Sequence, residues 1–254
     1  MRMGVAIANL VLGFVYCSYG VITIIDLARG WRVNGLSHFG LAWIAMAFTC
    51  GPHHVEHGYH LLDGRLGGPL DLTAVLVGFP AGVIWFLLRV EATAGGRGDR
   101  FVDGDPMWVK TLPALSTAYF VAMIVAAAVV LGSHDLEFGP RFVPNFLLLG
   151  LYFVLGAYLL RTQLRNRGPL GGWSLSGVTL TLVFPTCGVM HAVYAVYASS
   201  GRYAVDPHGL TIDWLAVPAA VYFLWVVRGL HQGVRTDWNR GAQGVRMATA
   251  PATA

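Results

Sequence analysis

Seven apolar stretches, each long enough to cross a lipid bilayer, constrain the fold of this chain more than any other feature. Crossing roughly 30 Å of hydrocarbon takes about 20 mostly apolar residues in a helix. Such segments are helical because backbone polar groups find no water in the membrane. The stretches lie near residues 4–26, 38–62, 70–90, 112–133, 142–163, 173–199 and 211–231. The sequence therefore predicts an all-α, multi-pass membrane protein of seven transmembrane helices, forming a single membrane domain over residues 1–254.

The composition agrees with a membrane protein and excludes several functions. Of the 254 residues 56% are hydrophobic and 12% charged, whereas a soluble domain carries about a quarter charged residues. The arginines lie in short loops rather than in a patch, so no nucleic-acid partner is expected. Lys110 is the only lysine and lies between predicted spans, which excludes a retinal Schiff base on the last helix. The segment 16–19 offers no small-residue cleavage site, which favours a first membrane helix over a signal peptide.

The distribution of basic residues predicts the orientation in the membrane. Thirteen lysines and arginines fall on one side of the predicted helices. Only Arg2, Arg65, Arg141 and Arg202 fall on the other side. Because cytoplasmic loops carry the excess of basic residues, we predict a plasma-membrane protein with its N-terminus outside and its C-terminus in the cytoplasm. The Gly-, Ala- and charge-rich tail over about 235–254 is predicted to be mobile.

Two of the stretches share a string that indicates an internal duplication. A shift of 137 residues superimposes the Thr-Cys-Gly at 49–51 on the Thr-Cys-Gly at 186–188, and His54 on His191. The resulting units are repeat 1 over about 4–90, a linker helix over about 112–133 and repeat 2 over about 142–231. One linker helix makes the two repeats parallel, so we expect a 3+1+3 arrangement about a pseudo-two-fold axis along the membrane normal. The second and sixth helices then approach each other near that axis.

The residues that carry chemistry lie on these two helices, in the outer half of the predicted membrane domain. At 3.6 residues per turn, positions i, i+4 and i+7 share one face of a helix. Two such stripes are Cys50, His54 and His57 on the second helix and Cys187, His191 and Tyr194 on the sixth. His53, Glu56 and His60 extend the first stripe to one side. Ionisable groups inside membrane spans are costly, so this cluster is a candidate functional site facing the extracytoplasmic side.

Binding of a transition metal is the chemistry that these residue types fit best. Imidazole and thiolate suit zinc or copper better than they suit iron in this setting. The candidate metal ligands are Cys50, His53, His54, His57, His60, Cys187 and His191. One set of four is Cys50, His54, Cys187 and His191, which would close the coordination sphere. Ligation by His53, His57 and His191 instead leaves a position for water, with Glu56 and Tyr194 as candidate catalytic groups.

Three alternatives to a metal site stay open. A b-type haem would use His54 and His191 as axial ligands, with Gly51 and Gly188 giving the macrocycle room near the backbone. A proton or solute pathway without a fixed metal would also place ionisable groups in the membrane. The histidines, cysteines and threonines could instead only hydrogen-bond across a helix interface.

In helix number and in intramembrane histidines the chain resembles the seven-helix ceramidase and adiponectin-receptor hydrolases, which bind zinc. Their last helix carries two histidines one turn apart, whereas the last helix here has only His231, near its cytoplasmic end. The 3+1+3 plan is similar to that of SWEET-type sugar carriers. The expected functions are therefore a metal-dependent membrane enzyme acting on a lipid-like or membrane-soluble substrate, a haem electron-transfer subunit, or a transporter of a metal ion, proton or small solute. The expected partner is the lipid bilayer; the sequence leaves open a homo-oligomer or a membrane partner subunit.

Overall fold

The computed structural model describes residues 1–64, 69–76, 78–95, 101–102, 107–168, 172–201, 207–234 and 237. The helices are α1 (Arg2–Asn34), α2 (His38–Leu62), α3 (Pro69–Leu76), α4 (Gly78–Thr93), α5 (Met107–Gly132), α6 (Phe142–Asn166), α7 (Leu175–Ser199) and α8 (Pro207–His231). Two short strands, β1 (Phe101–Val102) and β2 (Trp173–Ser174), pair antiparallel. This confirms the predicted all-α fold. Arg65, Arg202 and all of the predicted tail except Asp237 lie outside the described residues.

Five of the described helices are long and apolar enough to cross a membrane: α1, α5, α6, α7 and α8. Helix α2 has the necessary length, but its five histidines lower its apolar character. The predicted span at 70–90 is divided between α3 and α4, each of which is shorter than a span needs. The chain is therefore membrane-protein-like, while crossings by α2 and by the α3–α4 segment stay predictions.

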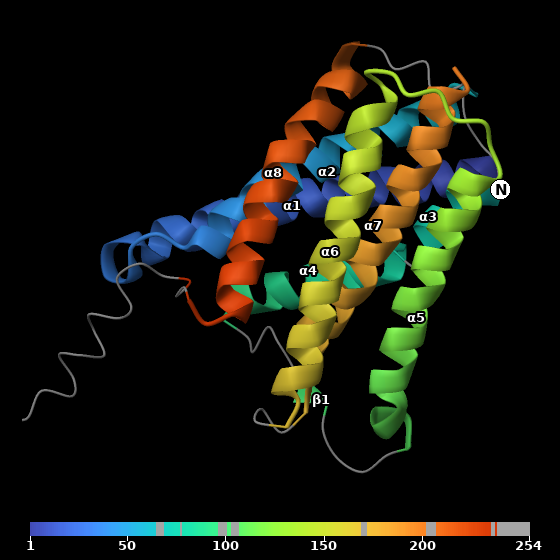
Figure 1. Cartoon of the computed structure of the whole chain (residues 1–254). Coiled ribbons are helices and arrows are strands. Elements are labelled where there is room, and N and C mark those ends of the chain that lie inside the picture. The colour runs from blue at the N-terminus through green and yellow to red at the C-terminus, as the bar shows by residue number, and fades with distance from the viewer. Residues whose placement is uncertain are drawn as a thin grey trace, which may run out of the picture.

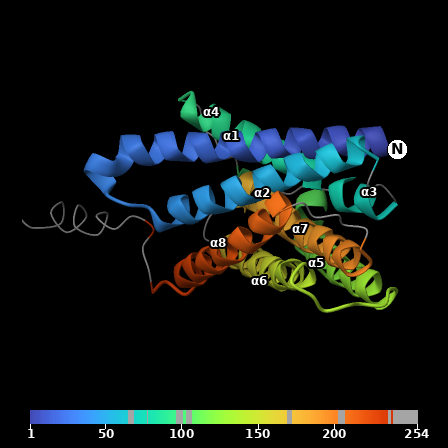
Figure 2. The same cartoon turned by 90° about the horizontal axis from the view of Figure 1, so that it is seen from above.

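Two helical hairpins form the centre of the molecule. Helix α1 packs along α2, and α6 packs along α7. The α1–α2 hairpin crosses the more upright helices α5–α8 at a steep angle (Figure 1), and the view from above shows α2 and α7 toward the middle with α5 at the edge (Figure 2). Helix α2 contacts α8, and α7 contacts α3, α4 and α5. Almost every residue of α7 from Thr179 to Tyr197 is buried, so α7 is the core helix of the fold.

Small residues bring the helices of each hairpin into close contact. A Cβ added to Gly51 of α2 would lie 2.5 Å from Cys17 Sγ of α1. A Cβ added to Gly156 of α6 would lie 3.1 Å from Pro185 Cδ of α7. Glycine therefore lets the backbones approach more closely than any larger residue would permit. This close packing positions the polar side chains of α1 and α6 against those of α2 and α7.

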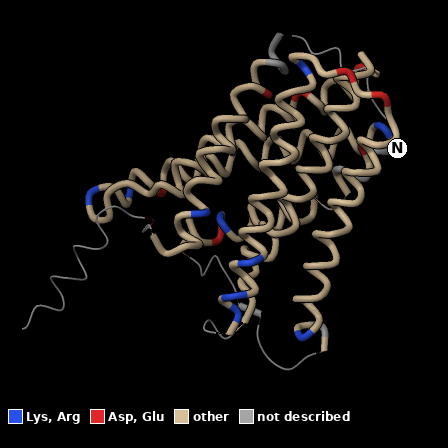
Figure 3. Tube along the Cα trace, in the orientation of Figure 1, with Lys and Arg blue, Asp and Glu red and all other residues tan. Residues whose placement is uncertain are grey.

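Charged residues divide between the two ends of the molecule. Figure 3 shows most lysines and arginines at the end where α1 and α6 finish and α5 begins. Arg2 begins α1, Arg141 directly precedes α6, and Asp135 and Glu137 lie between α5 and α6, so these four residues are at the opposite ends of those helices. This asymmetry is of the kind from which membrane orientation is predicted. The candidate site lies on the half of α2 that is remote from the basic end.

Candidate functional site

The predicted site histidines lie in the interior of the helical domain. The side chains of His53, His54, His57, His60 and His191 are each at most 3% exposed. The first four come from the second half of α2, and His191 comes from the middle of α7. Polar rings this deeply buried need hydrogen-bond partners, because an unsatisfied buried polar group costs about 1–3 kcal/mol.

Three of these histidines surround Tyr194 of α7. The ring centroid of Tyr194 lies 4.8 Å from that of His53, 4.6 Å from that of His57 and 6.0 Å from that of His191. The rings of His53 and His191 are 5.3 Å apart. The structure thus brings together the predicted open-site ligands and the predicted catalytic tyrosine. Glu56 lies within electrostatic reach of His53, and His60 within reach of His57.

Asp213 of α8 links two of the three histidines. Its Oδ1 lies 3.0 Å from His53 Nδ1, and its Oδ2 accepts a hydrogen bond of 2.8 Å from Asn145 Nδ2. The Oδ1 of Asn145 lies 2.8 Å from His191 Nδ1. Since an amide oxygen only accepts, the Nδ1–H of His191 is the donor. One polar chain therefore runs from His53 through Asp213 and Asn145 to His191.

Asp71 of α3 contacts the third histidine, His57. Its Oδ1 lies 3.2 Å from His57 Nε2, and its Oδ2 accepts a 2.8 Å hydrogen bond from the Tyr197 hydroxyl. Asp71 is 2% exposed and Asp213 is fully buried. Both aspartates were absent from the predicted site, although a charged residue inside an apolar span is itself a signal for function.

The other ring nitrogens of these histidines are also buried. Within the described part of the chain, His53 Nε2, His54 Nε2 and His57 Nδ1 have no hydrogen-bond partner. Each of the three rings is thus held at one nitrogen and unbonded at the other. Histidines that bind metals commonly show this division, with the second ring nitrogen donating to a carboxylate or carbonyl oxygen.

His54 is bound within its own hairpin rather than in the cluster around Tyr194. Its Nδ1 lies 2.8 Å from Asn9 Oδ1 of α1, and its ring lies 5.4 Å from that of Tyr16. His191 has the corresponding partners on α6, Asn145 and Tyr152, and the Tyr152 ring stacks on it at 5.1 Å. The two predicted axial histidines therefore have closely similar surroundings in the two hairpins.

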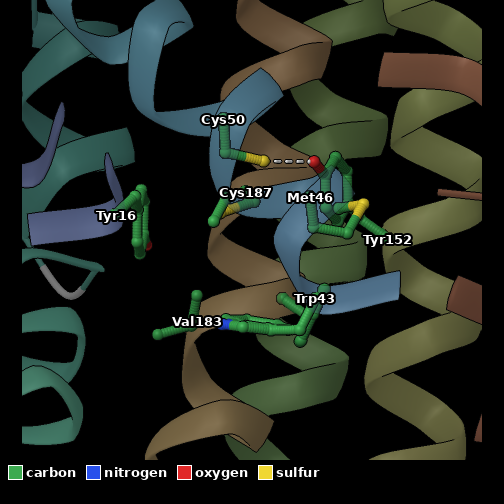
Figure 4. Close-up of a pocket in the computed structure, with 9 residues that line it drawn as sticks. Tyr16, Trp43, Met46, Cys50, Tyr152, Val183 and Cys187 are labelled. Atoms are coloured by element: carbon green, nitrogen blue, oxygen red, sulfur yellow. Dashed lines mark hydrogen bonds between the residues drawn. The ribbon is translucent and has the colours of Figure 1, made fainter. Parts of the chain in front are cut away.

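The predicted cysteines line a separate small cavity between α2 and α7 (Figure 4). Cys50 Sγ lies 2.8 Å from the Tyr152 hydroxyl, and Tyr16 lies beside Cys187. Each tyrosine therefore reaches the cysteine of the other hairpin. The cavity volume is about 20 Å³, enough for about one water molecule. Bulky Trp43 and Phe184 also line the cavity, with Trp43 on the side away from Cys50 in the close-up.

No ready-made metal site is present among the described residues. No three side chains of His, Cys, Asp or Glu in this part of the chain are arranged to hold one ion. The set of four formed by Cys50, His54, Cys187 and His191 therefore stays a prediction, as does the open set of three histidines. Binding by either set requires side chains to rotate.

Comparison with known proteins adds no family to these observations. The chain matches no protein-family model, no curated protein and no solved structure. The chemistry of the buried cluster is therefore the ground on which a function is proposed.

Proposed function

We propose that the protein is a metal-dependent membrane enzyme that binds one zinc or copper ion through His53, His57 and His191. The observation that supports this proposal is that the three rings have the same kind of polar partner and lie around the same side chain. Each has one nitrogen held by an oxygen of Asp213, Asp71 or Asn145, and the three surround one tyrosine. Fixing one ring nitrogen sets the orientation and raises the basicity of the other, which is the usual function of residues behind metal ligands.

The charges of the cluster suit a divalent cation. Three neutral imidazoles carry no charge, whereas the buried carboxylates of Asp71 and Asp213 supply two negative charges next to them. In an apolar interior, a dication and two nearby carboxylates compensate each other, and either alone is costly to bury. This balance favours zinc or copper in the divalent state over an apolar ligand.

Tyr194 and Glu56 are the proposed proton-transfer groups. Tyr194 lies among the three rings, so its hydroxyl would be adjacent to a bound ion after a side-chain rotation. Glu56, near His53, would accept the proton of a metal-activated water, and Tyr194 would donate one to the leaving group. The substrate is proposed to be lipid-like or membrane-soluble, because the site lies inside an apolar helical domain.

Metal analysis of the purified full-length protein tests this proposal. The protein carries a tag without histidine and is loaded with zinc or copper separately. We expect about one ion per chain, and at least about tenfold weaker binding in each of H53A, H57A and H191A. His134→Ala, at an exposed position, is the matched control. No stoichiometric ion in the wild type, or equal loss in the control, would contradict the proposal.

An optical spectrum of the same sample addresses the haem alternative. In that alternative His54 and His191 bind the iron through Nε2, the ring nitrogen that does not contact Asn9 or Asn145. A Soret band that disappears in H54A and H191A would replace the metal-enzyme proposal with electron transfer. We expect no such band, because the cavity between α2 and α7 is far smaller than a haem.

We further propose that the two hairpins are a duplicated unit, with α5 as the linker, the N-terminus outside and the C-terminus cytoplasmic. The supporting contacts occur in pairs. Asn9 bonds His54 as Asn145 bonds His191. The caps also correspond, because Ser37 Oγ accepts from Gly40 N at 2.8 Å, and Ser174 Oγ accepts from Gly177 N at 3.0 Å. Packing of α2 on α8 likewise corresponds to packing of α7 on α3 and α4.

The tyrosine–cysteine pairs correspond in position but differ in hydrogen bonding, because the buried Tyr16 hydroxyl has no hydrogen-bond partner among the described residues. Tyr152→Phe removes the hydroxyl at Cys50, and Tyr16→Phe removes the one beside Cys187. We expect Tyr152→Phe to lower the free energy of unfolding by about 1 kcal/mol, the usual net value of one hydrogen bond, and Tyr16→Phe to lower it by less. Unfolding in mixed detergent micelles measures both, with Tyr59→Phe at an exposed site as the control. A loss in Y16F as large as that in Y152F would contradict this difference between the pairs.

A further inference from the structure

A second cavity lies between the two hairpins near the basic end of the molecule, remote from the histidine cluster. Its volume is about 250 Å³, close to the lower end of the range for small-molecule sites, roughly 300 Å³. The wall includes Tyr19 and Trp85 from the first half of the chain and Gln163 and Ser176 from the second. Neither the metal proposal nor the duplication assigns a ligand to this space.

One side of the cavity is apolar and closed by aromatic rings. The ring centroid of Trp85 lies 4.1 Å from that of Tyr19 and 4.3 Å from that of Trp43. Trp43 also lines the small cysteine cavity, so these rings separate the two cavities. Leu159 and Leu180 complete the apolar wall. A ligand that fills this part of the cavity must present a hydrocarbon surface.

The other side carries an arginine whose hydrogen-bonding capacity is incompletely used. Arg89 Nη2 donates to Asp26 Oδ2 at 2.8 Å, and the guanidinium lies 5.8 Å from the Tyr19 ring. Its Nε is buried and has no hydrogen-bond partner among the described residues. A guanidinium has five N–H donors in a planar fork, so it can hold Asp26 and a second acceptor at once. An oxygen of a ligand in the cavity would satisfy Nε.

The surrounding charge favours an anionic head group over a neutral one. Ser174 caps the N-terminus of α7 at the cavity wall, and Ser176 lies in the first turn. The N-terminal end of a helix carries a partial positive charge that attracts anions. Exposed Arg161 and exposed Arg165 lie in the last turns of α6, on either side of Gln163 in the sequence. A carboxylate in the cavity thus meets positive charge from Arg89 and from the N-terminal end of α7.

We propose that this cavity binds a small amphiphile with a carboxylate head, the head at Arg89 and the short hydrocarbon chain against Trp85 and the leucines. The site is independent of the metal proposal, because it contains none of the histidines. The carboxylate of Asp26, bound at Arg89 Nη2, repels a second carboxylate at Nε of the same guanidinium. Removal of the Asp26 charge therefore strengthens binding, whereas loss of the Arg89 charge weakens it.

Binding of hexanoate to the full-length protein in detergent, followed by ligand-observed NMR titration, tests this site. Hexanamide is the isosteric neutral control, and acetate represents the head group alone. We expect hexanoate to bind at least about tenfold more tightly than either, since a hydrogen bond to a charged group and apolar burial both contribute. Acetate binding equal to hexanoate would show a simple anion site and overturn the amphiphile, and equal binding of hexanamide would overturn recognition of the charge.

Four variants distinguish hexanoate binding in this cavity from general attraction of an anion to the basic residues. We expect Arg89→Gln to weaken hexanoate binding at least about tenfold and Asp26→Asn to tighten it. Ser176→Phe should block the cavity without any change in charge. Arg161→Gln removes one positive charge at the same end and should leave binding unchanged. Equal weakening in R89Q and R161Q, or weakening in D26N, would overturn the proposal, and thermal unfolding of each variant shows that it is folded.

Discussion

Asp213→Ala is expected to lower the free energy of unfolding by about 3–5 kcal/mol, the usual cost of removing one member of a buried polar pair. Asp213 is fully buried and interacts with both His53 and Asn145. Its loss removes the 3.0 Å ion-pair contact of His53 Nδ1 and leaves the Asn145 Nδ2 group without its acceptor. Through Asn145 the change also reaches His191.

The measurement is equilibrium unfolding in mixed micelles, with Asp135→Ala as the matched control. Asp135 is exposed in the loop after α5, so its removal should change stability by less than about 0.5 kcal/mol. Asp213→Asn keeps the shape and one acceptor oxygen and should cost less than the alanine variant. A loss below about 1 kcal/mol in D213A would contradict the buried polar chain described above. The proposed metal site adds a second readout, since D213A should also weaken metal binding about 10–100-fold.

The fold was predictable wherever hydropathy alone specifies a helix. The stretches predicted at 142–163 and 173–199 correspond to α6 and α7 with boundaries within a few residues. Helix α1 continues beyond the predicted end near residue 26 to Asn34. Its last turns are polar, so hydropathy alone does not predict them. The segment predicted as one span at 70–90 is described as α3 and α4. Crossing angles between hairpins depend on tertiary packing, which a single sequence does not display.

The histidines and Tyr194 of the site could be named from the sequence, but their partners Asp71, Asp213 and Asn145 were missed, and the grouping was predicted only in part. Helical periodicity placed Cys50, His54 and His57 on one stripe, yet His54 bonds Asn9 while His57 contacts Tyr194. His54 and His57 have different partners because the contacts come from neighbouring helices, and Asn9 belongs to α1. The polar residues of the apolar spans, Asn145 above all, would have been found by asking which buried groups a membrane histidine needs as partners.

Gly51→Leu is expected to destabilise the protein by about 3 kcal/mol, at the upper end of the usual cost of overpacking. A Cβ at this position would lie 2.5 Å from Cys17 Sγ, 3.1 Å from the Cys17 backbone nitrogen and 3.2 Å from the Gly13 carbonyl oxygen. Two of these three atoms belong to the α1 backbone, so rotation of a side chain cannot relieve the clash. Helix α1 must move away from α2, which also separates Asn9 from His54.

Gly150→Leu of α6 is the matched control for this effect. It is the same substitution in a membrane-like helix, but a Cβ at Gly150 meets no atom within 4 Å. Since leucine favours helix more than glycine by several tenths of a kcal/mol, we expect G150L to be neutral or stabilising. Unfolding of both variants in mixed micelles therefore distinguishes close hairpin contact from a general intolerance of larger residues. If G51L unfolded within about 1 kcal/mol of the wild type, α1 and α2 would not meet at this glycine, and the position of His54 between Asn9 and Tyr16 would have to be abandoned.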